Sequence, residues 1–229
     1  MTRHVPVVIL LLLAAVARGG DAPKAGVDPD PQVKEPMLQE ELLAMVKEDQ
    51  KVRVEVLKEW ADKGVGPLAN KVITDPALVK MIQEGTRRMA DVDKKNRARL
   101  AEIVKKHGWP GKSLVGADGA HAAWLIMQHA DNDRAFQRRC LKLMKEAPKG
   151  EVEPADVAFL TDRLLIADKK KQLYGTQLVG ENGVFKPQPI EDEANVDKRR
   201  AEVGLGPLKE YLKQAVEAYE KAAAKPPEK

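Results

Sequence analysis

Polar residues interrupt an apolar stripe in the first helix that the sequence predicts. Asp49 stands four residues after Met45 and three residues before Val52, and Gln50 and Arg53 lie beside it. Burying an unpaired polar group costs about 1–3 kcal/mol, and burying an unpaired charge costs more. Such side chains must therefore meet partners, water or a ligand.

Comparable interruptions occur in three later segments with helical periodicity. Asn96 lies on the apolar stripe of a long helix, and Asp93 is adjacent to it. His129 follows the apolar run "AAWLIM", and Asp162 and Arg163 interrupt "VAFLTDRLLIA". Polar side chains from four helices favour one shared, partly hydrated cavity. The alternative is that they satisfy one another as scaffold, for example Asp49 with Arg53 one helical turn away.

His129 is the residue with the clearest chemical potential. Histidine is the side chain that titrates near neutral pH without perturbation, so His129 could act as a general base oriented by an acid such as Asp162. A hydrogen-bonded structural histidine is the alternative. His121 lies two helical turns away, ~12 Å along the axis, which is too far to share one metal ion. We expect no metal ion and no cofactor.

Composition limits the class of protein. The chain has 229 residues, of which 43% are apolar, 32% charged and only 4% aromatic, with a net charge of +4. These values predict one helical globular domain. Basic residues are interspersed with acidic ones and form no aromatic-interleaved stripe, which argues against nucleic-acid binding. Cys140 is the single cysteine, so an internal disulfide is excluded.

The first residues have the pattern of a secretory signal. Arg3 and His4 precede an apolar run at 5–17 that ends in a small-x-small site at Ala17. We therefore expect a signal peptide over 1–17, cleavage near Ala17, and a secreted or periplasmic protein with no membrane span after cleavage. The run of ~13 residues is short for a span of ~20, and an uncleaved anchor is the minority alternative.

The remaining chain predicts a single mainly α domain. A flexible linker at 18–36 precedes a helical domain at 37–224, and a disordered tail follows at 225–229. About six helices are expected. They cover 37–62, a long helix opened by Asp75 and Pro76, a helix capped by Asp118, one capped by Asp131 or Asn132, one from Pro154 and one from Pro207.

One non-helical element is expected late in the chain. The runs "QLYGTQLV" and "VFKPQPI" flank Asn182-Gly183, which predicts a β-hairpin near 172–190. In a strand, Gln172, Tyr174 and Thr176 would share one face. The hypothesis is that Gln172 and Tyr174 close the polar cavity beside His129 and Asp162. The alternative is a strand whose polar face only anchors loops.

The motifs "GWP", "QHAD", "LTDR", "QLYGTQ" and "VDKRR", in this order, resemble a bacterial family known as domain of unknown function 6624. The resemblance extends from about Met37 to Tyr211. It implies no established activity, and so no mechanism. The polar positions that it implies are Gln128, His129, Asp131, Asp162, Arg163, Gln172, Tyr174, Gly175, Thr176, Gln177, Asp192, Arg199 and Arg200.

Two functions remain open from the sequence. The first is an exported domain with a polar cleft that binds, and in one version hydrolyses, a small polar or peptide-like envelope ligand. The second is a non-catalytic structural or partner-binding module of the cell envelope. In the "VDKRR" motif, one arginine is expected to pair with Asp162 or Asp192 and the other to face an anionic ligand group. With His129 and Asp162 as the acid/base pair, the expected ligand-binding residues are Asp49, Gln50, Arg53, Asp93, Asn96, Gln128, Asp131, Arg163, Gln172, Tyr174, Gln177, Asp192, Arg199 and Arg200.

Overall fold

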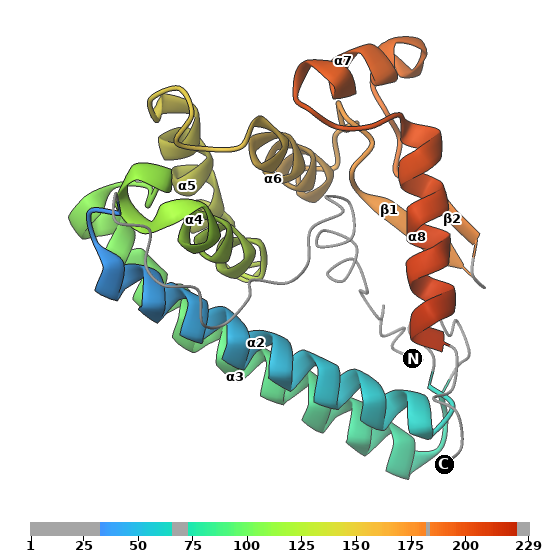
Figure 1. Ribbon diagram of the computed structural model, residues 1–229. Coiled ribbons are helices and arrows are strands. Elements are labelled where there is room, and N and C mark those ends of the chain that lie inside the picture. Colours follow the sequence, from blue (N-terminus) through green and yellow to red (C-terminus); the bar gives the residue numbers. More distant parts are fainter. Residues whose placement is uncertain (1–32, 66–72, 182–183, 224–229) are drawn as a thin grey trace.

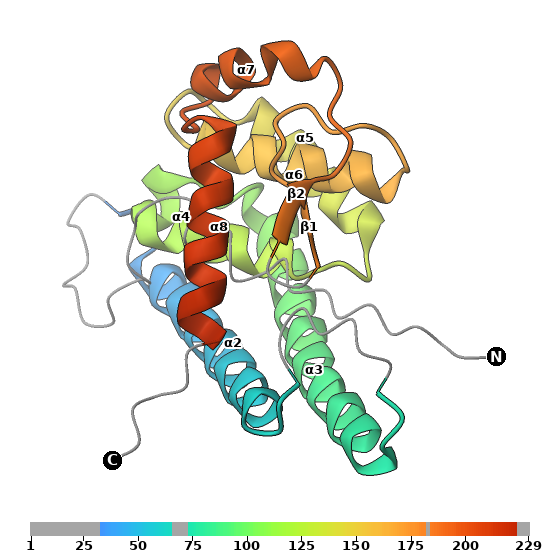
Figure 2. The ribbon, with the colours of Figure 1, turned by 90° about the vertical axis from the view of Figure 1, so that its right-hand side faces the viewer.

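Two long antiparallel helices form one side of the molecule. The computed structural model describes residues 33–65, 73–181 and 184–223. α2 (Pro36–Asp62) and α3 (Pro76–His107) lie side by side, and their far ends extend beyond the other elements (Figures 1 and 2). The predicted cap of α3 is confirmed, because the Asp75 carboxylate accepts a hydrogen bond from the backbone N–H of Ala77 at 2.8 Å.

Three shorter helices pack around one end of this pair. α4 (Lys112–Gln128) lies against both α2 and α3, α5 (Arg134–Glu146) follows it, and α6 (Pro154–Ala167) packs on α5. The predicted start of α4 at Asp118 was wrong, because a turn of helix precedes a break at 115–116. Gly116 takes a positive φ of 70° at that break, which glycine adopts without strain.

The cap of α5 also differs from the sequence expectation. Asp133, and not Asp131 or Asn132, accepts a hydrogen bond from the backbone N–H of Phe136 at 2.9 Å. Asp131 is unavailable as a cap because its carboxylate binds Arg163. A tertiary ion pair therefore decides where this helix begins.

The C-terminal part of the chain follows α6 and lies next to it (Figure 1). A two-stranded antiparallel hairpin, β1 (Leu178–Glu181) with β2 (Val184–Pro187), precedes a short η1 turn (Glu193–Asn195). α7 (Val196–Glu202) and α8 (Leu208–Ala223) complete the chain, and α8 packs beside β2 (Figure 1). α7 is a helix that the sequence analysis did not predict.

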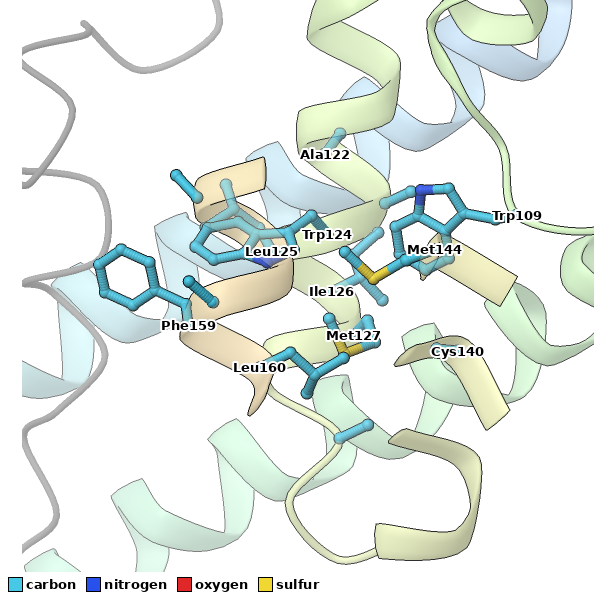
Figure 3. Close-up of a cluster of buried hydrophobic side chains, with 14 of the residues drawn as sticks. Trp109, Ala122, Trp124, Leu125, Ile126, Met127, Cys140, Met144, Phe159 and Leu160 are labelled. Atoms are coloured by element: carbon cyan, nitrogen blue, oxygen red, sulfur yellow. The ribbon is translucent and has the colours of Figure 1, made fainter. Parts of the chain in front are cut away.

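The main core lies among α2, α3, α4, α5 and α6 and extends to α8. Trp124, Met127 and Leu160 are fully buried there (Figure 3). The indole N–H of Trp124 donates to the backbone oxygen of Asp156 at 3.3 Å, and its ring meets Phe159 edge-on. This contact fixes which face of α4 is turned toward α6.

The prediction of a mainly α fold with one small hairpin is confirmed. The hairpin begins at Leu178, so the segment 172–177 is not the strand that was expected; Gln172 forms one isolated bridge to Ile190. The expected signal peptide, most of the linker, the Asn182-Gly183 turn and the tail at 225–229 lie outside the described residues. Within the described ranges, no helix is long and apolar enough to cross a membrane.

Candidate functional site

A buried cluster of charged residues joins α2, α3 and the end of α4. The Asp49 carboxylate accepts hydrogen bonds from Arg53 Nε at 3.2 Å and from Nη2 at 3.0 Å. Arg53 Nη2 also binds the carboxylate of Asp93 on α3. His129, at the C-terminal cap of α4, places Nδ1 3.0 Å from Asp49. We call these four residues the Asp49 cluster.

Helical spacing explains how charged residues come to lie in the interior. Val46, Asp49, Arg53 and Val56 follow one another at three- and four-residue steps, so they share the face of α2 that is buried against its neighbours. Asp49 is 2% exposed and Arg53 is 6% exposed. The apolar stripe therefore continues through the cluster, and each charge is paired with another.

The environment separates the pKa values of the two carboxyl groups. Burial favours a higher pKa for Asp49, but the hydrogen bond from His129 and the nearby Arg53 outweigh it and lower the pKa to about 2. For Asp93 burial prevails over the attraction of Arg53, and with repulsion from Asp49 and Asp131 it raises the pKa to about 7. Asp49 is thus ionised at neutral pH, while Asp93 is partly protonated.

His129 is held as a neutral imidazole. Burial lowers its pKa, and the hydrogen bond to Asp49 only partly opposes this effect. An ionised carboxylate accepts hydrogen bonds and donates none, so the proton of the neutral ring belongs on Nδ1, facing Asp49. The Nε2 atom is then unprotonated. This is the state of a histidine that can accept a proton from a reacting group.

The cluster also has the donor types of a metal site. Asp49, Asp93 and His129 each offer one ligand atom, and these atoms lie within 4.8 Å of one another. However, the Arg53 guanidinium binds both carboxylates, so a cation would have to displace a charge that is already in place. The arrangement therefore suits proton transfer better than metal binding.

A second polar group continues from the first. Asp131 accepts two hydrogen bonds from Arg163, each at 2.9 Å, and further bonds from Arg134 at 3.0 Å and from Gln137. Arg163 Nη1 reaches Gln177 at 3.4 Å. The charge of Asp131 raises the pKa of Asp93, and the charge of Arg163 lowers the pKa of His129. The two groups therefore influence each other electrostatically.

Asp162 has a different role from the one that the sequence suggested. Its carboxylate accepts hydrogen bonds from the backbone N–H groups of Leu173, Tyr174 and Thr176 at 2.7–3.1 Å, and from the Thr176 hydroxyl at 2.9 Å. Burial raises its pKa, although these donors oppose the change. The expected pairing of Asp162 with His129 is therefore corrected, since Asp49 orients the histidine.

The segment "QLYGTQ" is held in place by this carboxylate and by the side chain of Gln172. The Gln172 amide donates to the backbone oxygens of Gln177 and Gln188 at 2.9 and 2.8 Å, and it accepts from the Gln177 N–H at 2.8 Å. Gly175 takes a φ of 68°, and a Cβ there would lie 3.0 Å from Leu208. Tyr174 is half-buried, and its backbone, not its phenol, makes the contact with Asp162.

The two arginines of "VDKRR" also serve the fold. Arg199 donates to the backbone oxygens of Leu173 and Glu191 at 2.9 and 2.6 Å and binds the exposed Asp192. Arg200 donates to the backbone oxygens of Tyr174 and Gly206 and is 2% exposed. The expectation that one of them pairs with Asp162 or Asp192 is confirmed for Asp192, which Arg199 binds. The other arginine, Arg200, was expected to face an anionic ligand group, but it is buried and binds backbone oxygens instead.

The family is decided by a comparison along the whole domain. The family model described as "Family of unknown function (DUF6624)" matches residues 36–223. This chain belongs to that family. The resemblance inferred from the ordered motifs is thereby confirmed. No curated protein and no solved structure gives a significant match.

In this member of the family, the predicted polar residues fall into two groups. Those around His129 carry titratable chemistry; Gln50 binds Asp49 at 2.8 Å and Asn96 reaches the backbone of α2, so both border this group. Those around Asp162 fix the C-terminal segment. Arg134 and Gln137 were not predicted from the sequence, although Gln137 lies on the buried face of α5 one turn before Cys140.

A surface groove of about 440 Å³ lies away from the Asp49 cluster. It runs between α5 and α6, with Leu141, Leu164 and Leu165 among its lining residues, and contains no residue of the Asp49 cluster. The groove therefore gives no support to the predicted site.

The raised pKa of Asp93 gives a test of the cluster. Its folded pKa of about 7 lies above the unfolded value of 3.8, so ionisation of Asp93 lowers stability as pH rises between these values. Asp93→Asn removes the ionisable group and therefore this pH-dependent decrease in stability. The difference in melting temperature, variant minus parent, should grow from pH 5 to pH 8, which thermal unfolding in matched buffers measures.

Two features of this comparison isolate the titration of Asp93 from other effects of pH and charge. His129 is present in both proteins, so its opposing effect, a gain of stability as pH rises through its lowered pKa, largely cancels in the difference. Asp91→Asn removes an equal charge from the exposed face of α3 and should give no such trend. A difference that stays constant from pH 5 to pH 8 would show that Asp93 titrates normally.

Proposed function

We propose that this chain binds a small polar or peptide-like molecule beside the Asp49 cluster and hydrolyses it with His129 as general base. The observation that carries the proposal is the 3.0 Å contact between His129 Nδ1 and the Asp49 carboxylate, which leaves Nε2 free to accept a proton. Asp49 fixes the tautomer and stabilises the imidazolium that forms. The pairing is the same in kind as that of a histidine oriented by a buried aspartate in hydrolases.

Asp93 supplies the complementary acid. Groups whose environments push their pKa values apart are suited to opposite roles in proton transfer. His129 takes a proton from water as the hydroxide forms a bond to the substrate's acyl carbon, and protonated Asp93 gives a proton to the leaving atom as its bond to that carbon breaks. The proton taken up by His129 then returns to Asp93 through solvent water, which restores both groups for the next turnover.

The site is further proposed to act outside the cytoplasm. The basic residues and apolar run that open the chain support export, and an exported hydrolase would meet peptide-like envelope molecules. Detection of a processed protein in the secreted or periplasmic fraction, beginning after Ala17, would test this. Retention of the whole chain in the cytoplasm would contradict it.

The decisive substitution is His129→Gln, which keeps a polar group of similar length. Turnover of a hydrolysable compound, found by screening peptidoglycan fragments, short peptides and acylated amino acids with the full chain, should fall by about 10²–10⁴-fold. Product formation by mass spectrometry measures it. His107→Gln, on the final turn of α3 and remote from the Asp49 cluster in sequence, serves as the control.

The pH profile provides a second readout. His129 must be neutral and Asp93 protonated, so the rate should rise through the lowered pKa of His129 and fall through the Asp93 pKa of about 7. Asp93→Asn should remove the alkaline limb. An unchanged rate in His129→Gln would rule out the catalytic role.

One observation favours a second, non-catalytic function. Several of the predicted polar residues form their hydrogen bonds with other groups of the protein, as structural residues do; these include Asp131, Asp162 and Arg200. A structural or partner-binding module of the envelope would show no hydrolysis and no stabilisation by any compound of the screen.

A further inference from the structure

Gln128, on the last turn of α4, contains a buried donor without an acceptor. Its side chain belongs to a residue that is 3% exposed, and its Nε2 atom has no hydrogen-bond partner among the described residues. Buried polar atoms are almost always paired, and an unpaired amide N–H destabilises the fold. This atom therefore calls for a partner that the described part of the chain does not supply.

Helical spacing places Gln128 on the side of α4 that faces α6. Trp124 lies one turn earlier on the same face, and it donates to the backbone oxygen of Asp156 on α6. About two turns further along α6 comes Arg163, whose charge affects the pKa of His129. Gln128 thus directly precedes His129 in the chain and lies on the face of α4 that Trp124 turns toward α6.

The acceptors in this region are already engaged. The Asp131 carboxylate takes hydrogen bonds from Arg163 and Arg134, and Asp162 takes four donors from 173–176. The Gln177 amide oxygen accepts from Arg163. An acceptor for the Gln128 N–H is therefore best supplied by a molecule that enters the site.

We propose that Gln128 is the substrate-binding donor of this site and that its substrates are acyl compounds. The Nε2–H donates to the carbonyl or carboxylate oxygen of the substrate, while the adjacent His129 activates the water that attacks the same acyl carbon. The inference rests on the proposed function, because it assigns the oxygen of the bond that is broken. A donor in this place also stabilises the negative charge that develops on that oxygen.

A comparison of two buried glutamines tests the proposal without any ligand. Gln137 is fully buried like Gln128, but its Nε2 donates to the backbone oxygen of Met127 at 3.2 Å and has further acceptors. Gln128→Leu removes an unpaired donor, so the melting temperature should stay the same or rise by a few degrees. Gln137→Leu should lower it by roughly 2–4 °C or more, since satisfied hydrogen bonds are lost. A fall in Gln128→Leu as large as in Gln137→Leu would overturn the proposal.

Ligand binding is tested with probes of defined chemistry. N-acetylalanine and N-acetylalaninamide, which offer acyl oxygens, should raise the melting temperature of the parent chain, and propylammonium should not. Gln128→Leu should weaken acyl-probe binding roughly tenfold or more, the loss expected for one hydrogen bond. Equal binding by parent and variant, binding of propylammonium alone, or no acyl-probe binding to the parent would each refute the assignment.

His129→Gln separates this inference from the proposed function. That variant should still bind the acyl probes while losing turnover, because it keeps Gln128 and lacks the base. Probe binding that depends on Gln128 together with turnover that does not depend on His129 would reject the catalytic proposal and keep the donor. Turnover lost in His129→Gln, together with probe binding that Gln128→Leu does not affect, would keep the catalytic proposal and reject the donor role of Gln128.

Discussion

Asp162→Asn should lower the free energy of unfolding by about 3–5 kcal/mol. The carboxylate accepts hydrogen bonds from three backbone N–H groups and from the Thr176 hydroxyl, and it is fully buried. An asparagine has one acceptor oxygen, and its NH2 group would face donors. Urea unfolding measures the change.

The effect should be concentrated in one segment. Hydrogen exchange of the backbone amides of Leu173, Tyr174 and Thr176 should accelerate in the variant, since these are the groups that Asp162 holds. Asp168→Asn, at the exposed end of α6, is the control and should change little, because its ion pair with Arg138 is open to solvent. Unfolding of Asp162→Asn at the parental urea concentration would disprove the anchoring role.

Arg53→Met should lower the free energy of unfolding by about 3–5 kcal/mol at pH 8. The methionine retains the apolar stem of the side chain but leaves the buried Asp49 and the partly buried Asp93 without their shared cation. Two like charges in such a place repel each other, and water can solvate them only in part. Urea unfolding of parent and variant at pH 8 provides the measurement.

The loss from Arg53→Met should shrink at pH 5. The parental pKa of Asp93 is about 7 and rises further once the cation is removed, so at pH 5 this carboxyl group is protonated and a single charge remains. The double variant Arg53→Met with Asp93→Asn should recover part of the stability at pH 8. Arg99→Met, which removes an exposed arginine of α3, should show a small effect at both pH values. An equal loss at pH 5 and pH 8 would contradict the assigned charge states.

These two substitutions address the two polar groups separately. Asp162 fixes the segment 172–177 on α6, whereas Arg53 balances the charges around His129. If the proposed function is correct, His129→Gln abolishes turnover in a stable protein, while Asp162→Asn reduces turnover only through unfolding. The family's polar residues would then comprise a reactive set and a supporting set.

Local sequence determined the helices with strong end signals. Asp75 followed by Pro76 specifies the start of α3, and Pro154 specifies that of α6, because capping and the fixed φ of proline act within one turn. Periodicity also identified buried positions on α2, including Asp49 and Arg53. These predictions succeed because each depends on residues no more than four apart.

Tertiary structure decided the pairing of the polar groups. His129 could have been oriented by any buried acid, and the sequence analysis named Asp162, but α2 rather than α6 brings a carboxylate to Nδ1. Asp131, expected as a helix cap, instead binds Arg163, which leaves the capping to Asp133. Hydrogen bonding requires contact at about 3 Å, and helical periodicity does not specify which helices come that close.

The "QLYGTQ" segment shows the same division. Its polar composition indicated that the residues would be satisfied by partners, and the structure places Gln172, Thr176 and Gln177 in the interior. Alternation of side chains suggested a strand, yet a buried carboxylate gathers the N–H groups of the backbone and bends it into a loop. The sequence by itself thus determined the helical class, the family and the residues that must be paired; packing of the helices alone decided their partners, because that choice depends on contacts between residues far apart in the chain.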